Sequence, residues 1–313
     1  MKGLELARKY YLEYGAQMIS ESFPELESVI AVGLVGSGSE CLGYDDDISE
    51  DHDFEPGFCI FIPDENVIDF KTEFRLERAY AKLPKEFMGY TKSPTSPVGE
   101  KRHGVIRISD FLMRRVGSPS GELSLVEWFS IPEHSLTEVV GGEIFRDDSG
   151  IFTDIRNRLS AMPCDVRLKK LAGHLLLMAQ SGQYNYNRCI SRGETGAAQL
   201  AVIEFVKSAM QVIFLLNNKY MPYYKWSFRA LSELDKLSEL TYSLEYLISS
   251  ENGQENSVLK SDMIEDISGL IIEELKAQNL TEAICTDLEK HAYSVNDKIM
   301  DTDIRNKNIF YAV

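Results

Sequence analysis

The stretch VGLVGSGSECLGYDDDISEDHDF, residues 32–54, decides how the rest of the chain is interpreted. An apolar run over residues 29–35 ends in a turn rich in glycine and serine, which predicts a buried strand followed by a sharp change of direction. A polar, acidic stretch comes next and ends in Asp51 and Asp53, which are separated by His52. Whether the turn and the two aspartates belong to one site is the question on which the functional interpretation depends.

The two aspartates have the spacing of a metal site. Side chains alternate across a strand, so Asp51 and Asp53 at the start of a strand would point to one face and His52 to the other. Two carboxylates on one face repel each other unless a cation lies between them. Oxygen ligands of this charge suit Mg²⁺ or Mn²⁺, which also bind nucleotide phosphates.

The turn itself is a candidate phosphate site. Backbone N–H groups in such a turn can form an anion-binding nest, and glycine allows a phosphate to approach closely. A tight turn without a ligand is the alternative. A P-loop is excluded because no lysine follows, and a dinucleotide fingerprint starting at Gly36 would place Cys41 at its third glycine. The residues assigned to phosphate binding are Gly36, Ser37, Gly38 and Ser39.

The order of these features resembles the nucleotidyltransferase superfamily that includes DNA polymerase β and the aminoglycoside nucleotidyltransferases. The family pattern is an apolar residue, Gly-[Gly/Ser], a spacer, and then Asp-apolar-[Asp/Glu]-apolar. Gly38-Ser39 and Asp51-His52-Asp53-Phe54 fit this pattern, with His52 as a departure. The segments GLVGSGSECLGYDDDISEDHDFEPGF, GQYNYNRCISRGE and LLNNKYMPYYKWSFRAL resemble a bacterial branch of that superfamily with a C-terminal helical domain.

The resemblance implies a mechanism and a third acid. Asp51 and Asp53 would hold the metal ions, and the turn would bind the triphosphate while an acceptor attacks the α-phosphorus. The family adds a carboxylate from a neighbouring strand, for which Asp110 is the first candidate and Glu127 the second. Asp110 could equally be the N-cap of a helix over FLMRRVG.

Composition limits the partners. The 313-residue chain has a net charge of −16, which disfavours nucleic acid and anionic membranes as ligands. Its 44% hydrophobic and 26% charged residues are typical of a globular protein. Five cysteines without a CxxC pair, and a charged N-terminus, favour a cytoplasmic setting. The apolar run over residues 197–216 contains Glu204, Lys207 and Gln211 and favours a buried helix over a membrane span.

The pattern along the chain predicts an α+β protein with a small mixed sheet flanked by helices, followed by an all-α bundle. We expect strands within 28–36, 54–63, 103–109 and 141–147, and a helix over 65–83 whose apolar face includes Val67, Phe70, Phe74, Leu76 and Ala81. Residues 1–150 would form a nucleotidyltransferase-like catalytic domain. Residues 151–313 would form a helical domain that binds substrate or nucleotide.

The helical half offers cations beside aromatic rings. Tyr184, Arg188 and Arg192 share one helix face if that helix is continuous, and Lys225 and Arg229 repeat the spacing beside Trp226. They would bind the triphosphate tail or stack on a base, or else form salt bridges and core.

Together these features lead us to expect a Mg-dependent nucleotidyltransferase. It would transfer a nucleoside monophosphate, such as AMP from ATP, to an unknown small-molecule or protein acceptor. Two alternatives stay open: an inactive nucleotide- or partner-binding module on the same fold, and a glycosyltransferase that uses the two aspartates.

Overall fold

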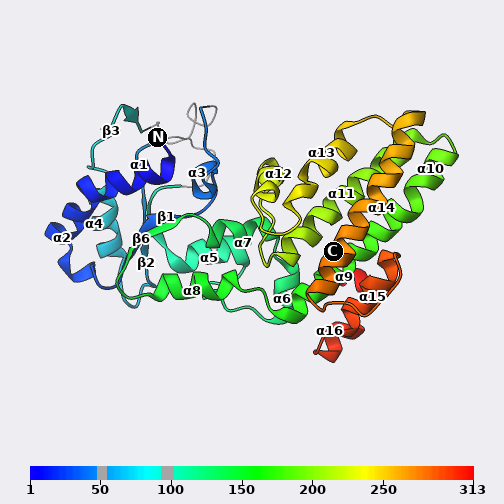
Figure 1. The fold of residues 1–313 in the computed structure, drawn as a ribbon. Coiled ribbons are helices and arrows are strands. Elements are labelled where there is room, and N and C mark those ends of the chain that lie inside the picture. Colours follow the sequence, from blue (N-terminus) through cyan, green and yellow to red (C-terminus); the bar gives the residue numbers. More distant parts are fainter. Residues whose placement is uncertain (48–54, 93–101) are drawn as a thin grey trace. The chain divides into compact units, whose positions relative to one another are not determined.

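The computed structural model describes residues 1–47, 55–92 and 102–313, and divides into two units (Figure 1). Unit 1 comprises Met1–Leu123 and Ser135–Ala161, and unit 2 comprises Ser124–His134 and Met162–Val313. The expected α+β class with a C-terminal helical region is confirmed. The expected division after residue 150 differs from this one because α8 (Ile151–Ser160) follows β6 (Glu143–Asp147) and packs against it.

Unit 1 is built on a four-stranded mixed sheet in the order β5-β2-β1-β6. The central strand β1 (Ala31–Leu34) is antiparallel to both neighbours, β2 (Cys59–Ile62) and β6. The edge strand β5 (Gly104–Arg107) runs parallel to β2. Each of these four strands lies within a segment whose sequence predicts a strand.

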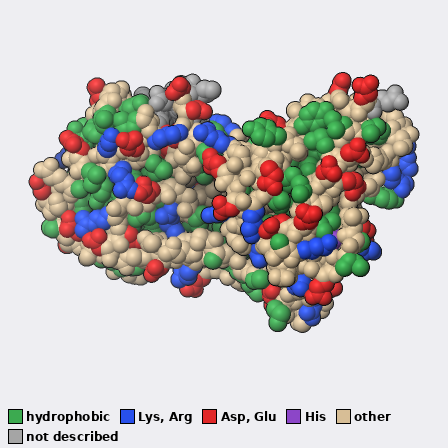
Figure 2. Space-filling view, in the orientation of Figure 1, with side chains coloured by type: hydrophobic (Ala, Val, Ile, Leu, Met, Phe, Trp, Pro, Cys, Tyr) green, Lys and Arg blue, Asp and Glu red, His purple; other side chains and the backbone are tan. Residues whose placement is uncertain are grey.

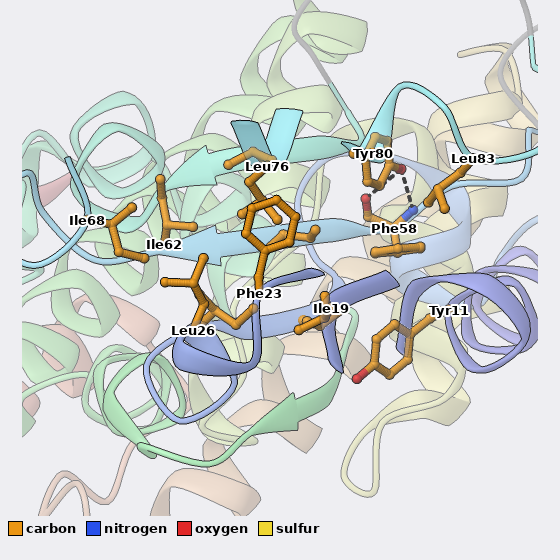
Figure 3. Packing of buried hydrophobic residues seen from close by; sticks show 14 of the residues in the cluster. Tyr11, Ile19, Phe23, Leu26, Phe58, Ile62, Ile68, Leu76, Tyr80 and Leu83 are labelled. Carbon is orange, nitrogen blue, oxygen red and sulfur yellow. Dashed lines mark hydrogen bonds between the residues drawn. The ribbon is translucent and has the colours of Figure 1, made fainter. Parts of the chain in front are cut away.

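One face of the sheet packs against the N-terminal helices and α4. The first helix is continuous over α1 (Gly3–Tyr10), a π-helical turn η1 (Tyr11–Gly15) and α2 (Ala16–Ser22). Its buried residues form one apolar cluster with Ile60 and Ile62 of β2 and with Leu76 of α4 (Phe70–Tyr80) (Figure 3). Alternation along β2 sends these side chains to the face opposite Phe61.

The other face of the sheet is covered by α5 (Ile108–Val116) and α8. Phe61 of β2 lies 4.3 Å from the ring of Phe152 in α8 and 5.3 Å from the ring of Phe111 in α5, measured between centroids. The sheet is therefore sandwiched between two helical layers. The remaining elements of the unit are η2 (Pro24–Leu26), α3 (Ser39–Leu42), the hairpin β3 (Glu86–Phe87) and β4 (Tyr90–Thr91), and α7 (Glu133–Val140), whose first two residues belong to unit 2.

Unit 2 is a bundle around α9 (Cys164–Met178) and α11 (Thr195–Leu216), which pack against each other. By length and composition α11 could cross a membrane, but 61% of its apolar window is buried inside the structure, in agreement with the buried helix expected from the sequence. A π-helix, η4 (Ala179–Tyr186), joins α9 to α10 (Asn187–Ser191). The other elements are α6 (Leu125–Ser130), α12 (Tyr224–Ser232), η5 (Ser238–Leu240), α13 (Thr241–Ser249), α14 (Gln254–Ala277), α15 (Leu288–Asp297), α16 (Thr302–Asn306) and η6 (Ile309–Ala312).

Candidate functional site

The glycine-rich turn follows β1 directly and has a backbone that requires glycine. β1 ends at Leu34, and both Gly36 and Gly38 have φ of +130°, which residues with a side chain rarely adopt. Ser39 then begins the short helix α3. Burial raises the pKa of the Cys41 thiol in this helix, so the cysteine beside the turn is a neutral thiol.

The sheet register brings this turn to the end where β2 begins. Gly33 of β1 is paired with Cys59 of β2, and the strands are antiparallel. The residues after β1 and the residues before β2 therefore lie at the same end of the strands. Asp51 and Asp53 lie outside the described residues, and the chain is described again from Glu55 onward.

The parallel pairing of β5 with β2 brings basic residues to this same end of the strands. Gly104 at the start of β5 is paired with Cys59. His103 lies against Gly57, with its Nδ1 3.2 Å from a carboxylate oxygen of Glu55. Arg102 forms an ion pair with Glu40 and donates a hydrogen bond of 3.3 Å to the carbonyl oxygen of Ser37 in the turn.

Asp110 lies beyond the opposite end of β5. The paired part of β5 ends with Arg107 beside Ile62, and Asp110 follows in the first turn of α5. The N-cap of α5 is Arg107, so the alternative role of Asp110 as an N-cap is wrong. Because the strand rises about 3.3 Å per residue, the length of β5 separates Asp110 from the start of β2. The strand register separates Asp110 from the start of β2, but Asp110 still lines one small cavity with Gly36 and Ser37 of the turn.

Glu127 belongs to unit 2 and has a structural task. Its carboxylate accepts hydrogen bonds of 2.7 Å from the backbone N–H and the hydroxyl of Ser124, which closes a capping box at the start of α6. These bonds from Ser124 lower the pKa of the Glu127 carboxyl.

A small cavity lined by arginines lies beside the turn in unit 1. Its volume is about 130 Å³. Four of its lining residues are arginines, which is a high share in a chain with 33 basic residues among 313. Both Gly36 and Ser37 belong to its wall, so the cavity is continuous with the predicted phosphate turn. The lining residues are Val35, Gly36, Ser37, Glu73, Arg102, Val105, Ile106, Arg107, Asp110, Phe111, Arg114 and Arg115.

The arginines of this cavity differ in what they already bind. Arg107 donates to the carbonyl oxygens of Pro63 and Ile68, each at 3.0 Å, and to the Glu73 carboxylate at 2.6 Å, so it ties the end of β5 to α4. Arg115 pairs with Glu138 of α7 at 2.9 Å. Arg102 pairs with Glu40. The chain thus balances each of these three arginines, of which Arg107 is buried and the other two are partly buried, with a nearby carboxylate.

The predicted cations of the helical half lie in unit 2 and in two separate places. Arg188 stacks on Tyr184, with its Cζ 4.6 Å from the ring centroid, and donates to the Tyr184 hydroxyl. Lys225 lies 5.0 Å from the ring centroid of Trp226 in α12, which also carries Arg229. Arg192 is the C-cap residue of α10.

The group with Tyr184 and Arg188 and the group with Lys225 and Trp226 lie near opposite ends of α11. α10 leads into its first residue, Thr195, and α12 follows its last residue, Leu216. A helix of this length is about 33 Å long. The structure therefore pairs Tyr184 with Arg188, and Lys225 with Trp226, but does not bring these pairs together.

A metal site is not visible in the described part of the chain. Within residues 1–47, 55–92 and 102–313, no group of three or more His, Cys, Asp or Glu side chains is placed to hold an ion. The predicted ligands, Asp51 and Asp53, lie outside these residues.

The comparison with known protein families returns one partial match. Residues 128–227 match the model of a family described as a domain of unknown function, DUF4037. The matched stretch is less than half of the chain, and it contains Tyr184, Arg188 and Trp226 but neither the turn nor β2. A search among curated proteins finds no match.

Proposed function

We propose that this protein is a Mg²⁺- or Mn²⁺-dependent nucleotidyltransferase. It transfers a nucleoside monophosphate, with ATP as the first donor to test, to a hydroxyl-type acceptor and releases pyrophosphate. Unit 1 is then the catalytic domain, and unit 2 contributes to binding the nucleotide or the acceptor. The acceptor is a small molecule or a protein, and the setting is the cytoplasm.

The antiparallel pairing of β1 with β2 is the observation that carries this proposal. It places the glycine turn, which follows β1, at the same end of the strands as the residues that precede β2. The motif that resembles the nucleotidyltransferases needs this arrangement, because its Gly-Ser turn and its Asp-x-Asp must serve one triphosphate. A parallel pairing would have put the two features at opposite ends of the strands.

Each part of the site has a defined task in the proposed reaction. Asp51 and Asp53 would hold the metal, which would supply positive charge to offset the charge of the phosphates. The open backbone at Gly36 and Gly38 lets phosphate oxygens approach the turn closely. Charges and hydrogen-bond donors that are already in place for the transition state commonly lower the activation barrier by several kcal/mol, about 3 kcal/mol for a single hydrogen-bond donor.

The decisive experiment removes both predicted metal ligands. We expect the variant with Asp51→Asn and Asp53→Asn to lose transfer from an α-labelled nucleotide in Mg²⁺, by about 10³-fold or more because the metal itself is lost. Asp47→Asn, at an exposed acid four positions before Asp51 in the sequence, is the matched control and should leave transfer unchanged. Transfer at the wild-type rate by the double variant rejects the proposal.

A second candidate is a module that binds nucleotide on this fold without chemistry. The observation that favours it is the start of β5, which lies at the same end of the sheet as the turn and has Arg102 and His103 there, whereas the candidate third carboxylate Asp110 follows the other end of that strand. Glu40 and Glu55 do reach this end of the sheet, but both contact these basic side chains. Saturable ATP binding without pyrophosphate release, across amine, hydroxyl and protein acceptors, would select this candidate.

A further inference from the structure

We infer that Arg102 and Arg115 are the side chains that bind a phosphate group at the glycine turn. In the structure, Glu40 forms an ion pair with Arg102 and Glu138 forms one with Arg115. The inference deepens the proposed function and rests on it for the identity of the ligand as a nucleoside triphosphate. The two arginines would recognise phosphate oxygens whatever group carries them, so the site would also bind other compact polyphosphates. It replaces the cations of unit 2 as the first contacts of the triphosphate.

Both glycines with unusual backbones are faced by a guanidinium nitrogen. A Cβ at Gly36 would lie 3.6 Å from Nη2 of Arg115, and a Cβ at Gly38 would collide with Nη2 of Arg102. The two arginines come from different elements, since Arg115 belongs to the last turn of α5 and Arg102 precedes β5. Two cations from separate elements thus converge on the two positions where the turn has no side chain.

Local structure accounts for this convergence. Arg102 reaches the turn because β5 is parallel to β2, and β2 is antiparallel to β1. α5 then runs back across the sheet, and Phe111 packs on Phe61 and within 3.8 Å of the Cβ position at Gly36. Arg115, one helical turn further on, extends beside this ring to the same place.

The carboxylates beside these arginines have the geometry of stand-ins for a phosphate. A carboxylate and a phosphate present oxygens to a guanidinium in the same way. Glu40 is 8% exposed, and a Cβ at Gly38 would lie 2.7 Å from one of its oxygens, so it occupies the face of the turn where a ligand would bind. Glu138 has a side chain that is 29% exposed and can leave Arg115 for solvent.

The size of the cavity limits which part of the ligand enters it. Its volume of about 130 Å³ is well below the range of roughly 300–1,000 Å³ found for pockets that enclose whole small molecules. The site therefore receives a phosphate group while the rest of the ligand stays outside. Arg107, on the same wall, is excluded as a phosphate ligand because carbonyl oxygens and Glu73 already bind it.

Tripolyphosphate and ATP are the probes, and adenosine is the negative ligand, in calorimetric titrations of the full chain without divalent metal. Loss of a charge-assisted hydrogen bond should weaken binding of both phosphate probes by about tenfold to a hundredfold in Arg102→Gln and in Arg115→Gln. Arg78→Gln, which removes the same charge from the exposed side of α4, should bind like wild type. Melting curves without ligand show whether each variant is folded.

Glu40→Gln separates a ligand site from a purely structural ion pair. If Glu40 competes with phosphate for Arg102, its neutralisation should tighten tripolyphosphate binding by severalfold while the unliganded protein becomes less stable. A structural pair predicts lower stability in both Glu40→Gln and Arg102→Gln with no change of affinity. That result, or a wild-type chain that binds neither phosphate probe, overturns the inference.

The two proposals fail in different ways. Tripolyphosphate binding that depends on Arg102, in a protein without nucleotidyl transfer, keeps this inference and rejects the proposed reaction. Transfer that depends on Asp51 and Asp53, in a protein whose Arg102→Gln and Arg115→Gln variants bind ATP normally, rejects only this inference.

Discussion

Tyr80 of α4 binds both backbone polar atoms of Phe58, the residue that leads into β2. Its hydroxyl donates to the Phe58 carbonyl oxygen at 2.8 Å and accepts from the Phe58 N–H at 3.0 Å (Figure 3). Phe58 is fully buried, and burial raises the pKa of the Tyr80 phenol well above its usual range. One neutral hydroxyl therefore fixes the point where the chain enters the sheet after the acidic stretch.

Tyr80→Phe should destabilise unit 1 more than its small change of volume suggests. It leaves a buried N–H without its partner, and such a loss costs about 1–3 kcal/mol. Urea denaturation of the variant should show this decrease in the free energy of unfolding. Tyr14→Phe, a tyrosine that makes an edge-on ring contact with Tyr10 in the same cluster, is the matched control. Equal stability of the two variants would mean that the bonds to Phe58 contribute nothing.

Gly38→Ala should disrupt the turn, whereas Gly43→Ala should be tolerated better. Gly38 has φ of +130° and ψ of 150°, a region essentially reserved for glycine, where strain costs about 1–3 kcal/mol. A methyl group there also meets Arg102. Gly43, the C-cap of α3, is in the ordinary left-handed region, and a Cβ there meets nothing within 4 Å. Denaturation curves should rank wild type above Gly43→Ala and Gly43→Ala above Gly38→Ala.

The strands of the sheet were accessible to sequence reasoning because their signals are local. An apolar run ending at glycine predicts β1, and a run of β-branched and aromatic residues predicts β2. The expected apolar face of the helix over 65–83 was wrong in part. Leu76 is buried, but Val67, Phe70 and Phe74 are each more than half exposed, and Tyr80 is buried in their place. α4 begins only at Phe70, after the N-cap Asp69, which shifts the buried stripe.

The arginines of the cavity could not be recognised from their spacing. Arg102 and Arg115 are far apart in the sequence and lie on different elements, so no periodicity joins them. The usable signal was the position of Arg102 immediately before a predicted strand. Spacing suggested Arg188 and Lys225 instead, because a shared helix face is visible in a sequence and a strand register is not. On the face drawn in Figure 2, acidic and basic side chains of the described residues are interspersed, so charge does not single out one region of that face.

Lys169→Met should loosen the C-terminal segment of unit 2. The Lys169 side chain is buried in α9, and its Nζ donates to Asn296 Oδ1 at 2.9 Å and to the backbone oxygen of Lys307 at 2.7 Å. Burial lowers the pKa of this ammonium. Methionine fills a similar volume but leaves the buried oxygens without a donor, which should cost about 1–3 kcal/mol.

Hydrogen exchange around residues 296–307 should increase in the Lys169→Met variant. Lys276→Met, at an exposed position in the last turn of α14, is the control. Unchanged exchange near Lys307 would show that the ammonium group does not hold the C-terminal segment in place.

His174 should make unit 2 less stable in mild acid. Burial in α9, together with the charges of Lys170 and Lys207, lowers the pKa of His174 to about 3, and its Nδ1 is buried without a hydrogen-bond partner in the described chain. Glu133 also faces this group through its ion pair with Lys170. The unfolded chain, with an ordinary histidine pKa of about 6.5, binds a proton that the folded chain excludes. Stability is therefore complete above about pH 6.5 and falls by up to about 1.4 kcal/mol for each pH unit below it.

His174→Gln should remove this slope, because glutamine does not titrate. The measurement is the free energy of unfolding in urea at several values between pH 5 and pH 7.5, taken as the difference between wild type and variant so that the carboxylates cancel. Lys207→Gln, which removes an exposed positive charge near the ring, should raise the pKa of His174 in the folded chain. The loss of stability would still begin near pH 6.5, but its total in strong acid would be smaller. Identical pH dependence in wild type and His174→Gln would mean that His174 accepts its proton equally well in the folded chain.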